Sequence, residues 1–180
     1  FYGARVDDIA AGANINKRMI YEYFGNKDAL YEQVLLHVYD RLEVRERTLL
    51  GEGLHGSELI RAIISMYFDF LHGNPTFVNI MMWENLCRAQ HLKVLQEGQV
   101  VRPTLADFVS EIERGKAQGV FRVDIDARQV AISLITICFS NFSNRYTLSR
   151  LFDCDLESDA FLQIRKAHTI GMLLTYMTKE

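Results

Sequence analysis

Apolar residues recur at helical spacing along nearly the whole chain, and no segment shows the sustained alternation that is typical of a β-strand. Residues that start and stop helices separate the periodic segments from one another. We therefore predict an all-α fold. A chain of 180 residues has room for one large helical body and a smaller additional unit.

Helix boundaries follow from capping and turn residues. Asn26 is predicted to cap a long helix through Leu49, with an apolar face at four-residue steps. Asn74 is predicted to cap a later helix whose first residue is Pro75. We expect helices over residues 57–72, 75–90, 102–118, 127–145 and 158–177, a short segment at 91–96, a cap at Asp126, a stop at Gly119, and a buried face on the long helix made of Leu30, Val34, Val38 and Leu42.

Residues 3–31 predict two short helices, a tight turn between them, and a second turn into the long helix. Asn14 lies in the first turn, where asparagine tolerates a left-handed backbone at modest cost. Asn16 follows and can cap the second short helix. The side chains expected to face inward are Val6, Ile9, Ala10, Ile15, Ile20 and Phe24.

The second short helix is expected to expose a face with two cations and two tyrosines. Such a face suits contacts with phosphates and base edges of DNA. The alternative is an amphipathic helix of any all-α protein that exposes such side chains to water. The exposed side chains are Asn16, Lys17, Arg18, Tyr21 and Tyr23.

This segment resembles the helix-turn-helix of the tetracycline-repressor (TetR) family. The matching residues are Gly3, Ile9, Ala10, Ala13, Ile15, Asn16, Lys17, Tyr21, Phe24, Lys27 and Leu30. The resemblance implies an N-terminal DNA-binding unit followed by a larger helical ligand-binding and dimerisation domain. It further implies phosphate contacts from Lys17, Tyr21, Tyr23 and Lys27, with Arg18 and Asn16 at base edges.

The segment departs from the family pattern at Asn14, where glycine is usual, and at Arg5, where serine or threonine is usual. Arg5 is either a phosphate contact or a solvated surface arginine. We expect the family's first helix and N-terminal arm to precede Gly3 and to be missing here. Residues 1–31 contain four cations and four anions, so few phosphate contacts and a strong salt dependence are expected. We predict residues 1–28 as the remainder of the DNA-binding domain and 29–180 as the regulatory domain.

The two helices predicted at 57–72 and 75–90 carry aromatic residues and methionines with a few polar groups. This composition is typical of small-molecule pockets, and it is equally that of a hydrophobic core. Glu84 is a ligand-binding group if it points inward and a solvated charge if it points outward. The candidate pocket residues are Tyr67, Phe70, Met81, Trp83, Glu84, Phe108 and Cys138.

The helix predicted at 127–145 is apolar almost all round, so several of its faces must be buried. The last helix carries a matching stripe. Together they resemble the family's dimer interface, a four-helix bundle with two helices from each subunit. The candidate interface residues are Phe139, Phe142, Phe161, Ile164, His168, Met172 and Tyr176, of which His168 is expected to be packed in the interface.

These features predict a cytoplasmic, ligand-responsive repressor that binds a pseudo-palindromic DNA operator as a homodimer. An unknown small-molecule effector would release it by tilting the long helix after Asn26. Two alternatives are a regulator whose helical domain binds another protein and one that senses thiol oxidation through Cys87, Cys138 or Cys154. The three separated cysteines suit a reducing cytoplasm.

Other functional classes find little support. The sequence contains no catalytic motif of the G-x-S-x-G, phosphate-loop or H-E-x-x-H kind, so we predict no enzyme. The histidines and cysteines lack zinc spacing, and no cofactor or metal is predicted. No uncharged apolar run reaches the ~20 residues that a bilayer crossing needs. The net charge of −3 means that DNA affinity must come from a local surface.

Overall fold

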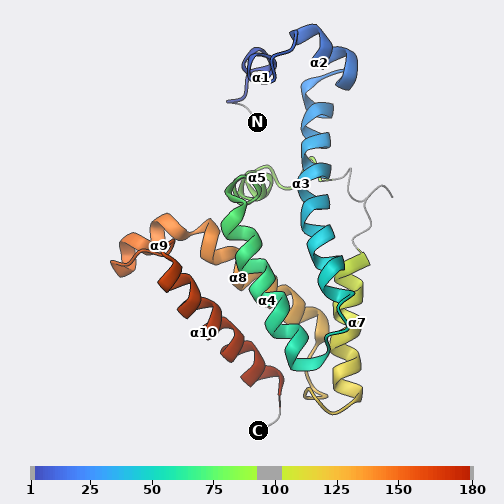
Figure 1. Cartoon of the computed structure of the whole chain (residues 1–180), viewed down its shortest axis with the longest axis vertical. Coiled ribbons are helices and arrows are strands. Elements are labelled where there is room, and N and C mark those ends of the chain that lie inside the picture. Colours follow the sequence, from blue (N-terminus) through green and yellow to red (C-terminus); the bar gives the residue numbers. More distant parts are fainter. Residues whose placement is uncertain (1–2, 93–102, 179–180) are drawn as a thin grey trace.

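All the regular secondary structure in residues 3–92 and 103–178 is helical; these are the residues that this computed structural model describes (Figure 1). A small N-terminal pair of helices sits at one end of a long helix, and the remaining helices form a larger body beside the rest of it. The all-α prediction and the order of a small unit followed by a larger one are confirmed.

The N-terminal pair consists of α1 (Val6–Gly12) and α2 (Lys17–Phe24). Asn14 adopts φ 53° in the turn between them, and the Asn16 side chain accepts a hydrogen bond of 2.8 Å from the Arg18 backbone N–H, both as predicted. Their small core consists of Val6, Ala10 and Ile20. The inward prediction for Ile15 is wrong, because this residue belongs to the turn outside both helices and is 36% exposed.

The long helix α3 (Lys27–Leu50) starts at a cap in which Asn26 accepts a hydrogen bond of 2.8 Å from the Ala29 backbone N–H. Its 24 residues give a length of about 36 Å. Val34, predicted to be inward, is 38% exposed, whereas Leu35 is fully buried. Four-residue steps advance by roughly 40° around a helix with 3.6 residues per turn, so a straight i, i+4 series leaves the buried face.

Six further helices form the helical body, in which α4 and α7 pack directly against α3. Helix α4 packs against α3, α5, α7, α8 and α10, which places it at the centre of this helical body (Figure 1). Asp126 and Ser158 cap the helices that follow them, and Gly119 turns the chain at φ 74°. The six helices are α4 (Gly56–Gly73), α5 (Pro75–Leu86), α7 (Pro103–Ala117), α8 (Ala127–Ser143), α9 (Arg145–Phe152) and α10 (Asp159–Met177).

Helix α5 starts at Pro75 as predicted, but its side-chain cap and its end differ from the prediction. The Asn74 side chain makes no cap; it donates to the Phe70 carbonyl at 2.7 Å and accepts a bond from Arg41 at 2.5 Å. The helix ends at Leu86 rather than near residue 90. Arg88 and Ala89 both take φ 56°, a left-handed conformation that a continuing helix does not allow.

Helix α9 was not predicted; it lies between the helices predicted at 127–145 and 158–177. Its last residue is followed by Asp153 in the left-handed conformation, which ends the helix. Predicted residues 93–96 of the short segment, and Arg102 at the expected start of α7, lie outside the described residues.

Candidate DNA-binding surface and ligand cavity

The exposed face of α2 carries the side chains that the sequence assigned to DNA. Tyr23 is 71% exposed, and Tyr21 is 44% exposed. Lys17 forms an ion pair of 2.9 Å with Asp7 of α1, and Arg18 pairs at 2.8 Å with Glu22 one turn along α2. The hydrogen bond between Lys17 and Asp7 lowers the pKa of the Asp7 carboxyl and raises that of Lys17. Exposed pairs of this kind contribute little, so phosphates can compete for both cations.

The other three predicted DNA contacts lie at the ends of these helices. Asn16 uses its side-chain oxygen to cap α2, which leaves the amide NH₂ as the group it can turn to DNA. Arg5 is exposed at the residue before α1, where its side chain makes no cap. Lys27 is half-buried at the first turn of α3. The fold therefore gathers all seven predicted residues at one end of the molecule (Figure 1).

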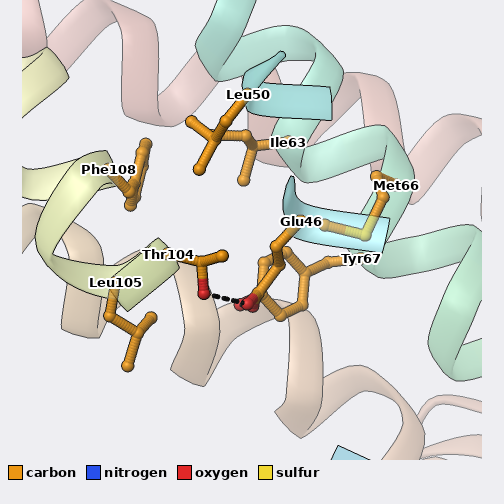
Figure 2. A pocket seen from close by; sticks show the side chains of 8 residues that line it. All are labelled: Glu46, Leu50, Ile63, Met66, Tyr67, Thr104, Leu105 and Phe108. Carbon is orange, nitrogen blue, oxygen red and sulfur yellow. Dashed lines mark hydrogen bonds between the residues drawn. The ribbon is translucent and has the colours of Figure 1, made fainter. Parts of the chain in front are cut away.

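At the other end of α3, the side chain of Tyr67 separates two cavities. The smaller has a volume of about 20 Å³, room for one water, and it is shown in Figure 2. It is lined by Glu46, Leu50, Ile63, Met66, Tyr67, Thr104, Leu105 and Phe108. The larger has a volume of about 180 Å³ and is lined by Tyr39, Leu42, Tyr67, Leu71, Phe77, Met81, Asn85, Ile135 and Phe139.

The smaller cavity contains a buried carboxylate, Glu46 of α3, which is 6% exposed. The Tyr67 hydroxyl of α4 donates to one carboxylate oxygen at 2.5 Å, and the Thr104 hydroxyl of α7 donates to the other at 2.6 Å (Figure 2). Glu46 was not predicted as a site residue, because it stands in a run of charged residues. Its position four residues after the buried Leu42 is the signal that could have found it.

Three of the seven predicted pocket residues line these cavities: Tyr67, Met81 and Phe108. Phe70 instead packs edge to face on Phe77, with ring centroids 5.2 Å apart. Cys138 is fully buried in the core, and this burial raises the pKa of its thiol to about 12.

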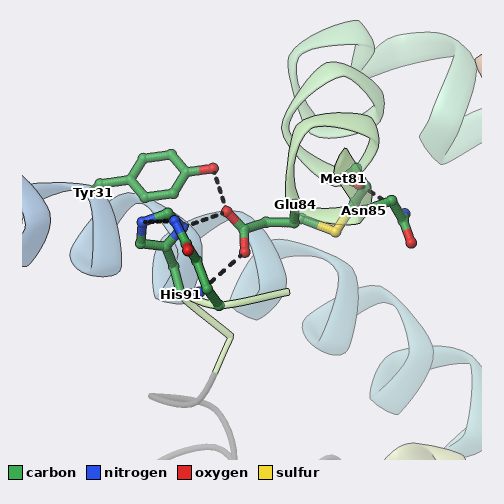
Figure 3. A network of polar contacts seen from close by, with 6 residues as sticks. Tyr31, Met81, Glu84, Asn85 and His91 are labelled. Carbon is green, nitrogen blue, oxygen red and sulfur yellow. Dashed lines mark hydrogen bonds and ion pairs between the residues drawn. The ribbon is translucent and has the colours of Figure 1, made fainter. Parts of the chain in front are cut away.

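Trp83 is half-buried on α5. Glu84 is inward, at 1% exposure, but its partners are other side chains. The Tyr31 hydroxyl of α3 donates to the Glu84 carboxylate at 2.9 Å, and His91 contacts it through Nδ1 at 2.9 Å and through its backbone N–H at 3.3 Å (Figure 3). Burial, together with the hydrogen bond to Glu84, raises the pKa of Tyr31. This network joins the end of α5 to the second turn of α3.

The predicted dimer residues divide between surface and core. Ile164, His168, Met172 and Tyr176 are exposed on α10 at four-residue spacing, and Phe161 is half-buried beside them. Phe142 does not belong to this surface: it is 4% exposed and packs on Phe68 within the same chain, because α8 lies against α4. Phe139 lines the larger cavity. The exposed apolar residues of α9, among them Leu151 and Phe152, were missed.

Metal sites and membrane-spanning helices are two further features to consider. In residues 3–92 and 103–178, no group of three or more His, Cys, Asp or Glu side chains is arranged to hold a metal ion. None of the helices within these ranges combines the length and apolar character that a bilayer crossing requires.

Family models match both halves of the chain. The model of bacterial regulatory proteins of the tetR family matches residues 1–34. The model of the tetracyclin repressor-like C-terminal domain matches residues 57–173, more than half of the sequence. The chain belongs to the TetR family of transcriptional regulators. The resemblance noted at the helix-turn-helix is thereby confirmed, and it extends over the helical body.

Individual TetR-family relatives agree with this assignment. The transcriptional repressor NicS of Pseudomonas putida is 32% identical over 157 residues, which cover 87% of this chain and 74% of NicS. The transcriptional activator FasR of Mycolicibacterium smegmatis is 27% identical over 88% of this chain and 69% of its own. These relatives are regulators of transcription, not enzymes.

A solved TetR-type structure has the same fold. The transcriptional regulator FadR from Bacillus subtilis, in complex with stearoyl-CoA, superposes with a TM-score of 0.74 over 97% of this chain and 89% of FadR. Sequence identity is 17%, so this likeness concerns the arrangement of helices alone.

Proposed function

We propose that this TetR-family regulator is a repressor that binds a pseudo-palindromic operator as a homodimer and releases it when a small molecule occupies the helical body. The observation that carries the proposal is the position of α3. Its first turn adjoins the helix-turn-helix, and its last turns supply Glu46 and Leu50 to the smaller cavity. A single helix therefore connects the candidate ligand site to the candidate DNA surface.

Ligand binding acts by shifting α3 relative to the helices packed on it. Tyr39 and Leu42 of α3 share the larger cavity with Phe77 and Met81 of α5, so an occupant that separates these walls moves the two helices apart. The Tyr31–Glu84 hydrogen bond ties α5 to α3 close to the DNA-binding end. Coupling between two such sites is typically worth ~1 to 3 kcal/mol, or about 5- to 150-fold in affinity.

Dimerisation supplies the second recognition helix. The exposed stripe on α10 offers apolar side chains to an identical stripe, as a two-fold interface requires. Two recognition helices about 34 Å apart would enter successive major grooves on one face of DNA. A repressor among the relatives and a ligand-bound regulator among the structural neighbours support the same function.

The DNA contacts are tested by two substitutions on an operator selected from a random duplex library with the wild-type protein. Arg18→Ala is expected to lose discrimination between selected and scrambled duplexes by ~1 to 3 kcal/mol, because its guanidinium reads base edges. Lys27→Ala is expected to weaken binding to both duplexes alike and to reduce the salt slope by about 1, because it contacts a phosphate. Fluorescence anisotropy at several salt concentrations measures both effects.

Arg61→Ala is the matched control, since Arg61 is an exposed arginine on α4 in the helical body. It should bind like the wild type. Equal affinities of the wild type, Arg18→Ala and Lys27→Ala for every duplex would remove α2 and the start of α3 as the DNA-binding surface.

A further inference from the structure

The two cavities on either side of Tyr67 indicate the chemistry of the ligand. We propose that the effector is a single-ring molecule with an ammonium group, whose ring fills the larger cavity and whose ammonium donates to Glu46 in place of the Tyr67 hydroxyl. This inference rests on the proposed function, because it assumes that this region is the ligand site.

Volume and wall chemistry select the ring. An apolar cavity of roughly 150 Å³ in another protein is large enough to bind benzene. The larger cavity has about 180 Å³, and Tyr39, Phe77 and Phe139 give it aromatic walls. A six-membered ring with one short substituent fits this space, whereas a long acyl chain exceeds it unless helices move.

The position of Tyr67 determines which chemical group the substituent on the ligand ring must carry. Tyr67 lines both cavities, and its hydroxyl bonds to Glu46 at 2.5 Å, so a ligand that extends from the larger cavity toward Glu46 displaces this hydroxyl. A carboxylate only accepts hydrogen bonds, so the group that replaces the hydroxyl must donate. An ammonium makes a stronger, charge-assisted bond than a neutral donor.

The charge at this site also selects against acids. Among the described residues that line either cavity, Glu46 is the only charged one. A ligand carboxylate placed beside it would meet a like charge at short range. The site therefore favours amines over acids of the same size.

Displacement of the Tyr67 hydroxyl explains how such a ligand would change the contacts between helices. Glu46, Tyr67 and Thr104 come from α3, α4 and α7, and their two hydrogen bonds join these helices at one point (Figure 2). Exchange of the tyrosine hydroxyl for a ligand ammonium removes the Tyr67 hydrogen bond between α4 and α3 and leaves the Thr104 bond between α7 and α3 in place.

Four compounds of nearly equal size test the inference: benzylamine, benzyl alcohol, toluene and benzoate. We expect calorimetry on the wild-type protein at neutral pH to rank benzylamine first, then benzyl alcohol, then toluene, with benzoate weakest. Benzylamine should bind about 10-fold or more tightly than toluene, the effect of one hydrogen bond to a charged group. Glu46→Gln should abolish this preference and leave toluene binding unchanged.

Glu43→Gln is the matched control, because Glu43 is also on α3 and buried but pairs with Arg47 outside the cavities. It should keep the wild-type ranking. Tyr67→Phe is the second variant: it removes the competing hydroxyl and should bind benzylamine more tightly than the wild type does.

Either of two results overturns the inference: benzoate binding as tightly as benzylamine, or the same amine preference in Glu46→Gln. Failure of all four compounds to bind also overturns it. None of these outcomes affects the conclusion of the operator experiment above, which tests DNA binding. Conversely, benzylamine bound through Glu46 without any effect on operator affinity would sustain the ligand chemistry and overturn the proposed release mechanism.

Discussion

At the scale of single residues, burial of polar groups determines which side chains connect the helices. Glu84 and Glu46 are 1% and 6% exposed, and removing a carboxylate from water is costly unless hydrogen bonds replace the lost solvent. Each accepts a tyrosine hydroxyl from a different helix. Each tyrosine therefore links two helices, and its removal takes one hydrogen-bond donor from a buried carboxylate.

Cys138 provides a residue-scale prediction about pH. Its thiol has a pKa of about 12 in the folded protein against an ordinary value of 9.0, because burial disfavours the thiolate. The unfolded chain therefore ionises first, so the stability from this thiol is complete below pH 9 and is lost as pH rises toward 12. Between these values the wild type should lose up to about 1.4 kcal/mol per pH unit relative to Cys138→Ala.

Urea unfolding at pH 7, 9, 10 and 11 measures this difference, and only its change with pH is informative, because the smaller side chain also leaves a cavity. Parallel pH profiles for the two proteins would show that the folded thiol ionises as readily as the unfolded one. The same burial makes Cys138 a poor redox sensor, since reactivity requires an accessible thiolate. The thiol alternative then rests on the half-buried Cys87 and Cys154.

At the scale of elements, the turn that follows α5 holds α5 against α3. The left-handed Arg88 and Ala89 reverse the chain, and His91 returns to the carboxylate of Glu84. The His91 ring also lies edge to face with Tyr31, at 5.0 Å between centroids. This turn clamps the second turn of α3 to the helix that lines the larger cavity.

Tyr31→Phe tests this clamp. The substitution keeps the ring but deprives a buried carboxylate of a donor, so the free energy of unfolding should fall by ~1 to 3 kcal/mol. Chemical denaturation followed by circular dichroism measures the change. Tyr23→Phe removes the same hydroxyl from a 71% exposed side chain and should change stability by less than about 0.5 kcal/mol. Equal effects of the two substitutions would mean that the Glu84 bond adds nothing.

At the scale of the whole molecule, α9 and α10 expose large apolar side chains. Ile164 on α10 is 70% exposed, and Leu151 and Phe152 on α9 are 77% and 73% exposed. Large exposed apolar patches commonly mark protein interfaces. A second copy of the chain is the partner we propose.

Ile164→Glu should convert the dimer to a monomer, because two-fold symmetry places the new charge near its own copy in an apolar contact. Sedimentation velocity measures the mass, and operator affinity should fall with it. Gln163→Glu adds the same charge at the neighbouring, exposed position of α10 that faces away from the stripe, and it should remain dimeric. A wild type that sediments as a monomer at all concentrations, or a dimer that tolerates Ile164→Glu, contradicts this interface.

The amino-acid sequence alone determined the features that depend on neighbours along the chain. Asn14 at the left-handed turn and the caps at Asn16, Asn26, Asp126 and Ser158 are each set by a few consecutive residues, so the helix-turn-helix and most helix boundaries were predictable. The exposed positions of Arg18, Tyr21 and Tyr23 followed from helical periodicity.

Only the tertiary structure decided which polar side chains are buried and what they meet. From the sequence, Glu46 is expected to be a surface charge. It lines a cavity instead, because α4 and α7 bring Tyr67 and Thr104 to it from 21 and 58 positions away. Phe142 was predicted to lie in the dimer interface, but it lies in the core because α4 covers it. Periodicity shows that a helix has a buried face, but the partner of that face is chosen by packing between segments distant in sequence, which no local pattern contains.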